Sequence, residues 1–145
     1  MAVDKISISL MPEVTVQIAK RHDRGDGGNR SFAVAKQLNR YFDMIDHCNR
    51  ELRSMLSDNE CALILDAFNG TLFLDPISIR YAWHEVADAV EMDRLDRKWA
   101  VDGKALVEKL QNLSFGHLIA LIDSAEIWWN RVGSGEQPKH GEMLK

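Results

Sequence analysis

The feature that most constrains this fold is a long segment, residues 30–57, that contains neither glycine nor proline. Its apolar residues recur at alternating spacings of four and three, which places them in one seam along a helix. The seam consists of Val34, Leu38, Tyr41, Ile45, Cys48, Leu52 and Met55. A seam of this length must pack against another helix. It either lies inside one chain or pairs two copies of the chain.

The segment before this helix predicts a strand followed by a short helix. Residues 5–10 alternate polar and apolar side chains, which is typical of a half-buried strand. Pro12 and Glu13 favour the start of a helix that runs to about residue 22. The β-branched residues of 14–18 also allow a second strand, which would give a hairpin instead.

After the long helix, capping residues predict a series of further helices. Ser57 and Glu60 have capping-box spacing before 61–68, Asp75-Pro76 opens the next helix, and Asp102 and Ser114 precede 103–113 and 115–131. Residues 133–145, with Gly-Ser-Gly and Gln-Pro-Lys-His-Gly, predict a mobile tail. We therefore expect three regions: 1–56, an acidic helical domain at 57–132, and the tail at 133–145.

Composition and charge narrow the class of protein. The 145 residues are 46% hydrophobic and 28% charged, as in an ordinary globular domain. The net charge of the whole chain is −4, which by itself argues against nucleic-acid binding. Residues 1–40, however, hold seven basic and four acidic side chains, a net charge of +3, so the remaining residues carry −7. No apolar run could span a bilayer, so we expect no membrane partner. Two cysteines and no signal-like N-terminus predict a cytoplasmic location.

A search for catalytic and metal-binding patterns is negative. The histidines form no His-Glu-x-x-His motif, and the two cysteines lack a second pair for zinc. The glycines at 25, 27 and 28 do not directly follow a strand, as a nucleotide cradle would need. We read the acidic series between residues 85 and 96 as a solvated helix face. The sequence thus predicts a protein that is not an enzyme and has no metal site or cofactor.

Residues 4–45 resemble the ribbon-helix-helix family of Arc- and MetJ-type repressors. The resemblance rests on the alternating strand, the Pro-initiated helix, the glycine turn and the run Asn-Arg-Ser-Phe-Ala-Val-Ala-Lys-Gln-Leu at 29–38. It implies a mainly α fold in which two copies pair their N-terminal strands as an intermolecular β-ribbon. An α-helical domain would follow the two helices of this unit.

The resemblance also assigns roles to individual residues. Lys5, Ser7 and Ser9 would face DNA bases, although the two serines are short for base discrimination. Asn29, Arg30 and Ser31 would hold a backbone phosphate at the start of the second helix. The implied dimer core consists of Ile6, Ile8, Leu10, Val34, Leu38, Tyr41 and Ile45.

The function predicted from these observations is that of a homodimeric regulator of transcription, or of a plasmid or operon, that binds double-stranded DNA. The alternative is a protein-interaction module, such as an adaptor or antitoxin-like partner, that uses residues 57–132 and does not bind DNA. Trp128 and Trp129 are candidates for its partner surface, because adjacent residues of a helix cannot both face one core. Packing of both tryptophans at the edge of the core is the competing interpretation.

Overall fold

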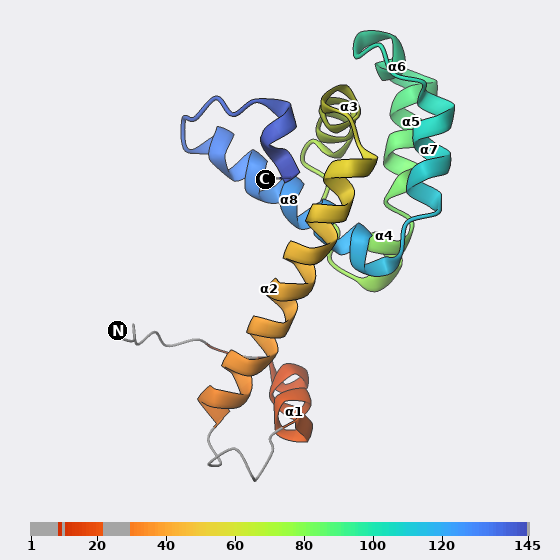
Figure 1. The fold of residues 1–145 in the computed structure, drawn as a ribbon. Coiled ribbons are helices and arrows are strands. Elements are labelled where there is room, and N and C mark those ends of the chain that lie inside the picture. The colour runs from red at the N-terminus through yellow and green to blue at the C-terminus, as the bar shows by residue number, and fades with distance from the viewer. Residues whose placement is uncertain (1–8, 10, 22–29, 145) are drawn as a thin grey trace. The chain divides into compact units, whose positions relative to one another are not determined.

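The computed structural model describes residues 9, 11–21 and 30–144, and the regular secondary structure in these ranges is entirely helical (Figure 1). The chain divides into two compact units, residues 1–43 and 44–145. The helices are α1 (Pro12–Arg21), α2 (Arg30–Met55), α3 (Asp58–Phe68), α4 (Pro76–Arg80), α5 (Trp83–Asp93), α6 (Leu95–Lys98), α7 (Gly103–Gln111), α8 (Phe115–Gly133) and the 3-10 helix η2 (His140–Leu144).

The N-terminal unit contains α1 and the first half of α2. Pro12 occupies the first position of α1, where the missing amide hydrogen costs no helical hydrogen bond. Glu13 lies in its first turn and two basic residues lie in its last turn, so both charges complement the helix dipole. Ile18 of α1 is half-buried and Ala33 of α2 is buried.

The predicted β-ribbon is wrong as an assignment of fold class. The described residues contain no strand, although the expectation of a mainly α protein is confirmed. A strand needs partner strands for its backbone groups, and the described part of this chain provides none. Residues 5–8 and 10 lie outside the described residues, and Ser9 is exposed without regular structure. The hairpin alternative is also wrong, because the start and end signals of α1 outweigh the β-propensity of its valines.

The predicted long helix is present as α2, and its seam changes environment along its length. Ile45, Cys48 and Leu52 are buried in the core of the C-terminal unit, with exposed fractions of 4%, 6% and 0%. Leu38 and Tyr41 are exposed at 46% and 37%. The units therefore divide within α2, earlier than the boundary at residue 56 that the sequence suggested, because the seam joins the C-terminal core from Ile45 onward.

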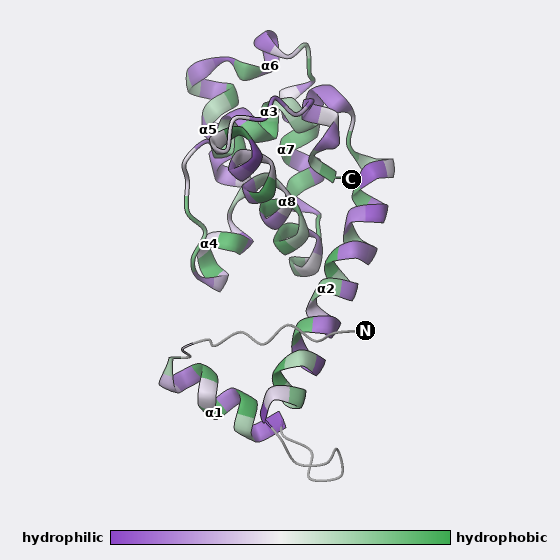
Figure 2. Cartoon of the chain, turned by 90° about the vertical axis from the view of Figure 1, so that its left-hand side faces the viewer, coloured by the Kyte–Doolittle hydropathy of each residue, from purple (hydrophilic) through white to green (hydrophobic). Residues whose placement is uncertain are grey.

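Helix α3 is the central element of the C-terminal unit. Every residue from Cys61 to Leu65 is buried, so the helix is apolar on all sides and must be surrounded. It packs against α5, α6 and η2. Figure 2 shows its hydrophobic residues in the interior of this unit, with hydrophilic residues on the outer helices.

The capping residues begin the helices as predicted. Ser57, Asp102 and Ser114 each accept a hydrogen bond from the backbone amide three residues ahead. Asp75 forms a full capping box with Ser78. The helix that begins at Pro76 ends at Arg80, and a turn at 81–82 separates it from α5.

The segment expected to be a mobile tail is packed against the core. Met143 and Leu144 of η2 are buried, and η2 contacts α3 and α8. The Arg53 Nε donates to the carbonyl of Leu144 at 2.5 Å, and the Trp128 Nε1 donates to the carbonyl of Lys139 at 3.0 Å. The Gly-Ser-Gly sequence therefore forms a turn that returns the chain to the core. Within the described ranges, no helix combines the length and apolar content that crossing a bilayer requires.

The two environments of the α2 seam predict different effects of the same substitution. Leu52→Ala should lower the free energy of unfolding of the C-terminal unit by about 3 kcal/mol, because it opens a cavity in the core. Leu38→Ala should change it by less than about 0.5 kcal/mol. All four tryptophans lie in residues 83–129, so denaturation followed by tryptophan fluorescence reports on this unit alone. Equal losses for the two variants would contradict the assignment.

Candidate functional site

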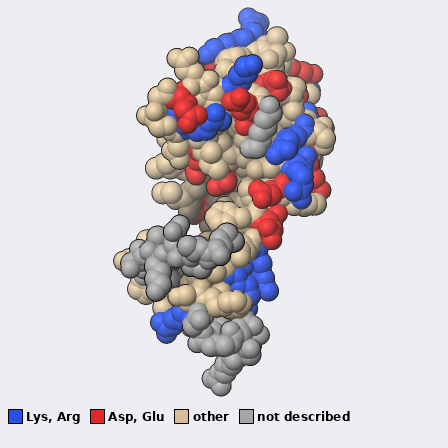
Figure 3. Space-filling view, turned by 60° about the vertical axis from the view of Figure 1, so that its left-hand side comes forward, with Lys and Arg blue, Asp and Glu red and all other residues tan. Residues whose placement is uncertain are grey.

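Positive charge dominates the described surface of the N-terminal unit. Its described basic side chains number five and its acidic ones two. The whole unit carries a net charge of +2, from seven basic and five acidic residues, whereas residues 44–145 carry −6, from eleven basic and seventeen acidic residues. In Figure 3, blue and red side chains are mixed on the C-terminal unit, while blue prevails over the described part of the N-terminal unit. The five basic residues are Lys20, Arg21, Arg30, Lys36 and Arg40.

The same two helices expose a large apolar surface. In the described part of the unit only Ala33 is buried, while large apolar side chains of both helices are 37–53% exposed, and Met11, just before α1, is 71% exposed. Large exposed apolar surface is typical of interaction sites. The exposed helical side chains are Val14 and Val16 of α1 and Phe32, Leu38, Tyr41 and Phe42 of α2.

The residues predicted to form the dimer core separate into three groups. Leu38 and Tyr41 are exposed and Val34 is half-buried, all on the N-terminal part of α2. Ile45 is buried in the core of its own chain, which leaves it no surface for a second copy. The remaining three residues, Ile6, Ile8 and Leu10, lie outside the described residues.

Two of the residues predicted to contact DNA phosphate lie in the first turn of α2. Arg30 and Ser31 are its first two residues, and both are exposed. The first turn of α2 itself contains no acidic residue, so within this turn the positive end of the helix dipole and the Arg30 guanidinium have the same sign. Lys20 and Arg21 end α1 on the other side of the connection between the two helices. Asn29 and the base-facing candidates Lys5 and Ser7 lie outside the described residues, and Ser9 is exposed.

The tryptophan pair on α8 is part of the core. Trp128 is 7% exposed, and Trp129 is half-buried with its Nε1 donating to the carbonyl of Leu65 at 3.2 Å. Their rings meet edge to face at 5.0 Å. Both indole nitrogens therefore have backbone partners inside the chain, and Trp129 also lines a small surface cavity.

A serine–histidine–glutamate arrangement was missed by sequence reasoning. The Ser114 Oγ lies 2.5 Å from His117 Nδ1, and His117 Nε2 contacts the carboxylate of Glu51, which lies far away in the sequence. The spacing of Ser114 and His117 is visible in the sequence, but nothing in it indicates Glu51. The same Oγ accepts the His117 amide as the N-cap of α8. We assign this group to fastening α8 onto α2, because its hydroxyl already serves as the cap.

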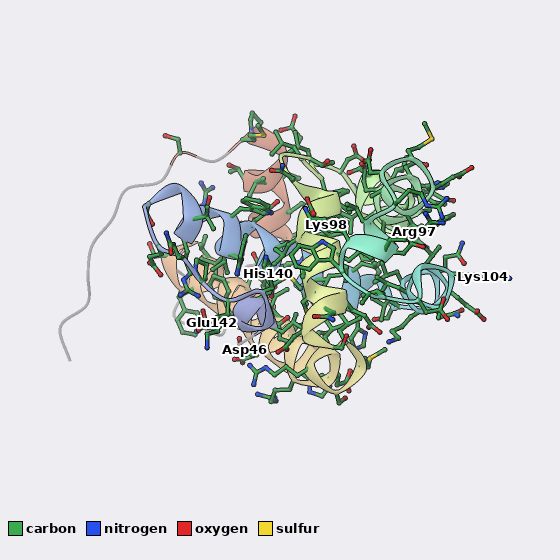
Figure 4. All side chains as sticks on the ribbon, turned by 90° about the horizontal axis from the view of Figure 1, so that it is seen from above. Asp46, Arg97, Lys98, Lys104, His140 and Glu142 are labelled. Atoms are coloured by element: carbon green, nitrogen blue, oxygen red, sulfur yellow. The ribbon has the colours of Figure 1, made fainter. Side chains whose placement is uncertain are left out.

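Asp66 of α3 is an electrostatic anchor within the C-terminal unit. Its Oδ2 accepts hydrogen bonds from Lys98 Nζ at 2.7 Å and Trp99 Nε1 at 3.1 Å. Burial acts to raise the pKa of Asp66, but these two hydrogen bonds and the charge of Lys98 outweigh it and leave the pKa below its ordinary value. Lys98 and His140 are both labelled in Figure 4, and the His140 ring lies edge to face against Trp99. This group holds α6 onto α3.

No set of three or more His, Cys, Asp or Glu side chains within the described ranges is arranged to hold a metal ion. Comparison of the chain with protein-family models, with curated protein sequences and with solved structures gave no match. The functional argument therefore rests on the surfaces described above.

The lowered pKa of Asp66 predicts a pH-dependent stability contribution. Asp66→Asn should reduce the free energy of unfolding by about 1 kcal/mol at pH 7, where the carboxylate is ionised in both states. The native state holds the proton less tightly than the unfolded state, so this contribution disappears as the pH falls through the native pKa. Denaturant titrations of both proteins at pH 7 and near pH 2.5 should show the difference shrinking. Asp88→Asn on α5 is the matched control, and a difference that persists at the acidic pH would refute this account.

Proposed function

We propose that this chain is a homodimeric DNA-binding protein whose N-terminal unit both pairs two copies and holds the DNA backbone. The observation that supports it is the coincidence, on the same two helices, of exposed apolar side chains and an excess of basic residues. The use we propose is regulation of transcription or of a plasmid or operon function.

The dimer is supported by the size and burial of the N-terminal unit. A unit of 43 residues is close to the limit below which domains need disulfides, metals or oligomerisation. Helix α1 has ten residues and none of them is buried, whereas isolated helices of this length are marginal in water. A second copy would cover the exposed side chains of Leu38 and Phe42, which lie one turn apart on α2. The partner we propose is therefore the same unit of another chain.

DNA is supported by the position of the basic residues. Lys20 and Arg21 end α1 and Arg30 begins α2, so three positive side chains flank the connection between the helices. Helix N-termini and basic side chains are the usual contacts of proteins with DNA phosphates. Phosphate contacts position a protein without reading sequence, so this surface accounts for affinity and not for a particular operator.

Removing the basic side chains should weaken DNA binding in a salt-dependent way. Arg30→Ala and Lys20→Ala should each reduce the affinity for a fluorescent DNA duplex several-fold at about 50 mM salt and lower the slope of log K against log salt by about one. Fluorescence anisotropy with the DNA upstream of the coding region and with a scrambled duplex measures both quantities. Lys104→Ala is the control, since Lys104 is exposed on α7 in the acidic unit and points outward in Figure 4. No binding at any salt concentration would disprove the DNA function.

Disrupting the exposed seam residue Leu38 together with its neighbour Phe42, one turn away on α2, should reduce DNA binding indirectly. The double variant Leu38→Ser, Phe42→Ser removes apolar surface that we assign to the dimer and leaves every basic side chain in place. We expect at least a tenfold loss of DNA affinity at protein concentrations below the dimer dissociation constant, partly recovered at higher concentration. Met92→Ser, at an exposed apolar position of the C-terminal unit, should have no effect. A loss independent of protein concentration would mean that the seam does not act through dimerisation.

The second candidate is a protein-interaction module without DNA binding. It is favoured by exposed apolar residues in the C-terminal unit, among them Leu72, Leu74 and Ile77 at 70%, 84% and 71%. A chain that dimerises through its N-terminal unit but fails to bind any duplex at low salt would support this alternative.

A further inference from the structure

A small apolar cavity opens on the surface of the C-terminal unit between the segment after α3 and the second half of α8. Its volume is about 130 Å³, which is below the range of pockets for cofactors and drug-sized ligands. A cavity of this size accommodates one apolar side chain, in the manner of an anchor pocket at a protein interface. Its main lining side chains are Phe68, Leu72, Phe73, Ile122, Glu126 and Trp129.

The segment that forms one wall presents further apolar side chains to solvent. Gly70 has φ of +76°, a left-handed conformation that turns the chain after α3. Phe73 then packs edge to face on Phe68, with ring centroids 5.0 Å apart, while its neighbours Leu72 and Leu74 are 70% and 84% exposed. Ile77, in the first turn of α4, is 71% exposed as well. Leu72 lines the cavity and Leu74 follows it two residues later, so neither leucine is part of the buried core.

The opposite wall includes one carboxylate, that of Glu126, which is exposed at the rim, and Asp123 lies just before it on the same helix. Asp123 and Glu126 lie one turn apart on α8, and Glu126 lines the cavity. Burial raises the pKa of both groups, and the charge of Asp123 raises that of Glu126 further. The nearby Arg131 is engaged by Glu136 at 2.8 Å and Glu142 at 3.5 Å. An incoming cation would relieve the repulsion between the two carboxylates.

We propose that the cavity between residues 70–73 and the second half of α8, with the exposed leucines beside it, is a docking surface for a basic amphipathic helix of a partner protein. One large apolar side chain of that helix enters the cavity, and a Lys or Arg one turn away lies against Asp123 and Glu126. Apolar anchors at helical spacing with flanking charges are the usual form of helix-in-groove recognition. This surface belongs to the C-terminal unit, so the proposal does not depend on DNA binding.

The test uses the full chain and two fluorescein-labelled peptides. One peptide is an amphipathic helix of Leu, Ala and Lys, and the other has Glu in place of every Lys. We expect the Lys peptide to bind and the Glu peptide to bind at least tenfold more weakly. The double variant Leu72→Ser, Leu74→Ser should lower the affinity for the Lys peptide about tenfold, because it removes apolar contacts with the peptide's anchor side chain. Glu126→Gln should lower the affinity about threefold, because it removes one charge that faces the peptide. These side chains are exposed or at the rim, so circular dichroism should confirm unchanged folding.

Matched controls separate docking from general attraction to an acidic protein. Met92→Ser removes an equally exposed apolar side chain, and Glu91→Gln removes an exposed carboxylate of α5. Neither should change peptide affinity. Equal losses from Glu91→Gln and Glu126→Gln, or unchanged binding in the Leu72, Leu74 variant, would overturn the proposal. Sedimentation of the same variant tests the other occupant: a loss of self-association would show that a second copy occupies this surface, and this too would overturn it.

Discussion

Burial of the α2 seam in the C-terminal core is the interaction on which the rest of the structure depends. Ile45, Cys48 and Leu52 fill the core with no more than 6% exposure, and Leu52 alone represents about 3 kcal/mol of stability. Burial raises the pKa of the Cys48 thiol, as expected for a side chain enclosed by apolar neighbours. The same periodicity continues toward the start of α2, where Leu38 and Tyr41 are exposed. The apolar seam is therefore longer than the core it enters, and we propose that a second copy of the chain covers Leu38 in the remaining part.

This division gives the two units different physical tasks. The C-terminal unit is stabilised by the enclosed helix α3 and by anchors such as Asp66, whose two hydrogen bonds hold α6 in place. On α8 of the same unit, burial raises the pKa of Asp123 and of Glu126, and the charge of Asp123 raises that of Glu126 further. In the described part of the N-terminal unit only Ala33 is buried and basic residues outnumber acidic ones, and the proposed dimer and DNA contacts rest on these two features.

The sequence predicted those features that local chemistry determines. The seam of α2 and the caps at Ser57, Asp102 and Ser114 depend on residues close in the chain, and the structure confirms them. The prediction of a β-ribbon failed because strand pairing depends on residues far apart or on another chain, and the described part of this chain contains no partner strand. The packing of 140–144 and the contact of His117 with Glu51 join residues far apart in sequence, which no pattern of spacing reveals. The same holds for the cavity beside Trp129, whose walls come from two distant segments.

The central claim is that the exposed part of the α2 seam pairs two copies of the chain. Sedimentation equilibrium of the unmodified protein without DNA tests it most directly, over a range from about 1 to 100 μM, where interfaces of moderate affinity dissociate measurably. The account predicts a mass that rises with concentration toward twice that of the chain. A mass equal to one chain throughout this range would contradict it.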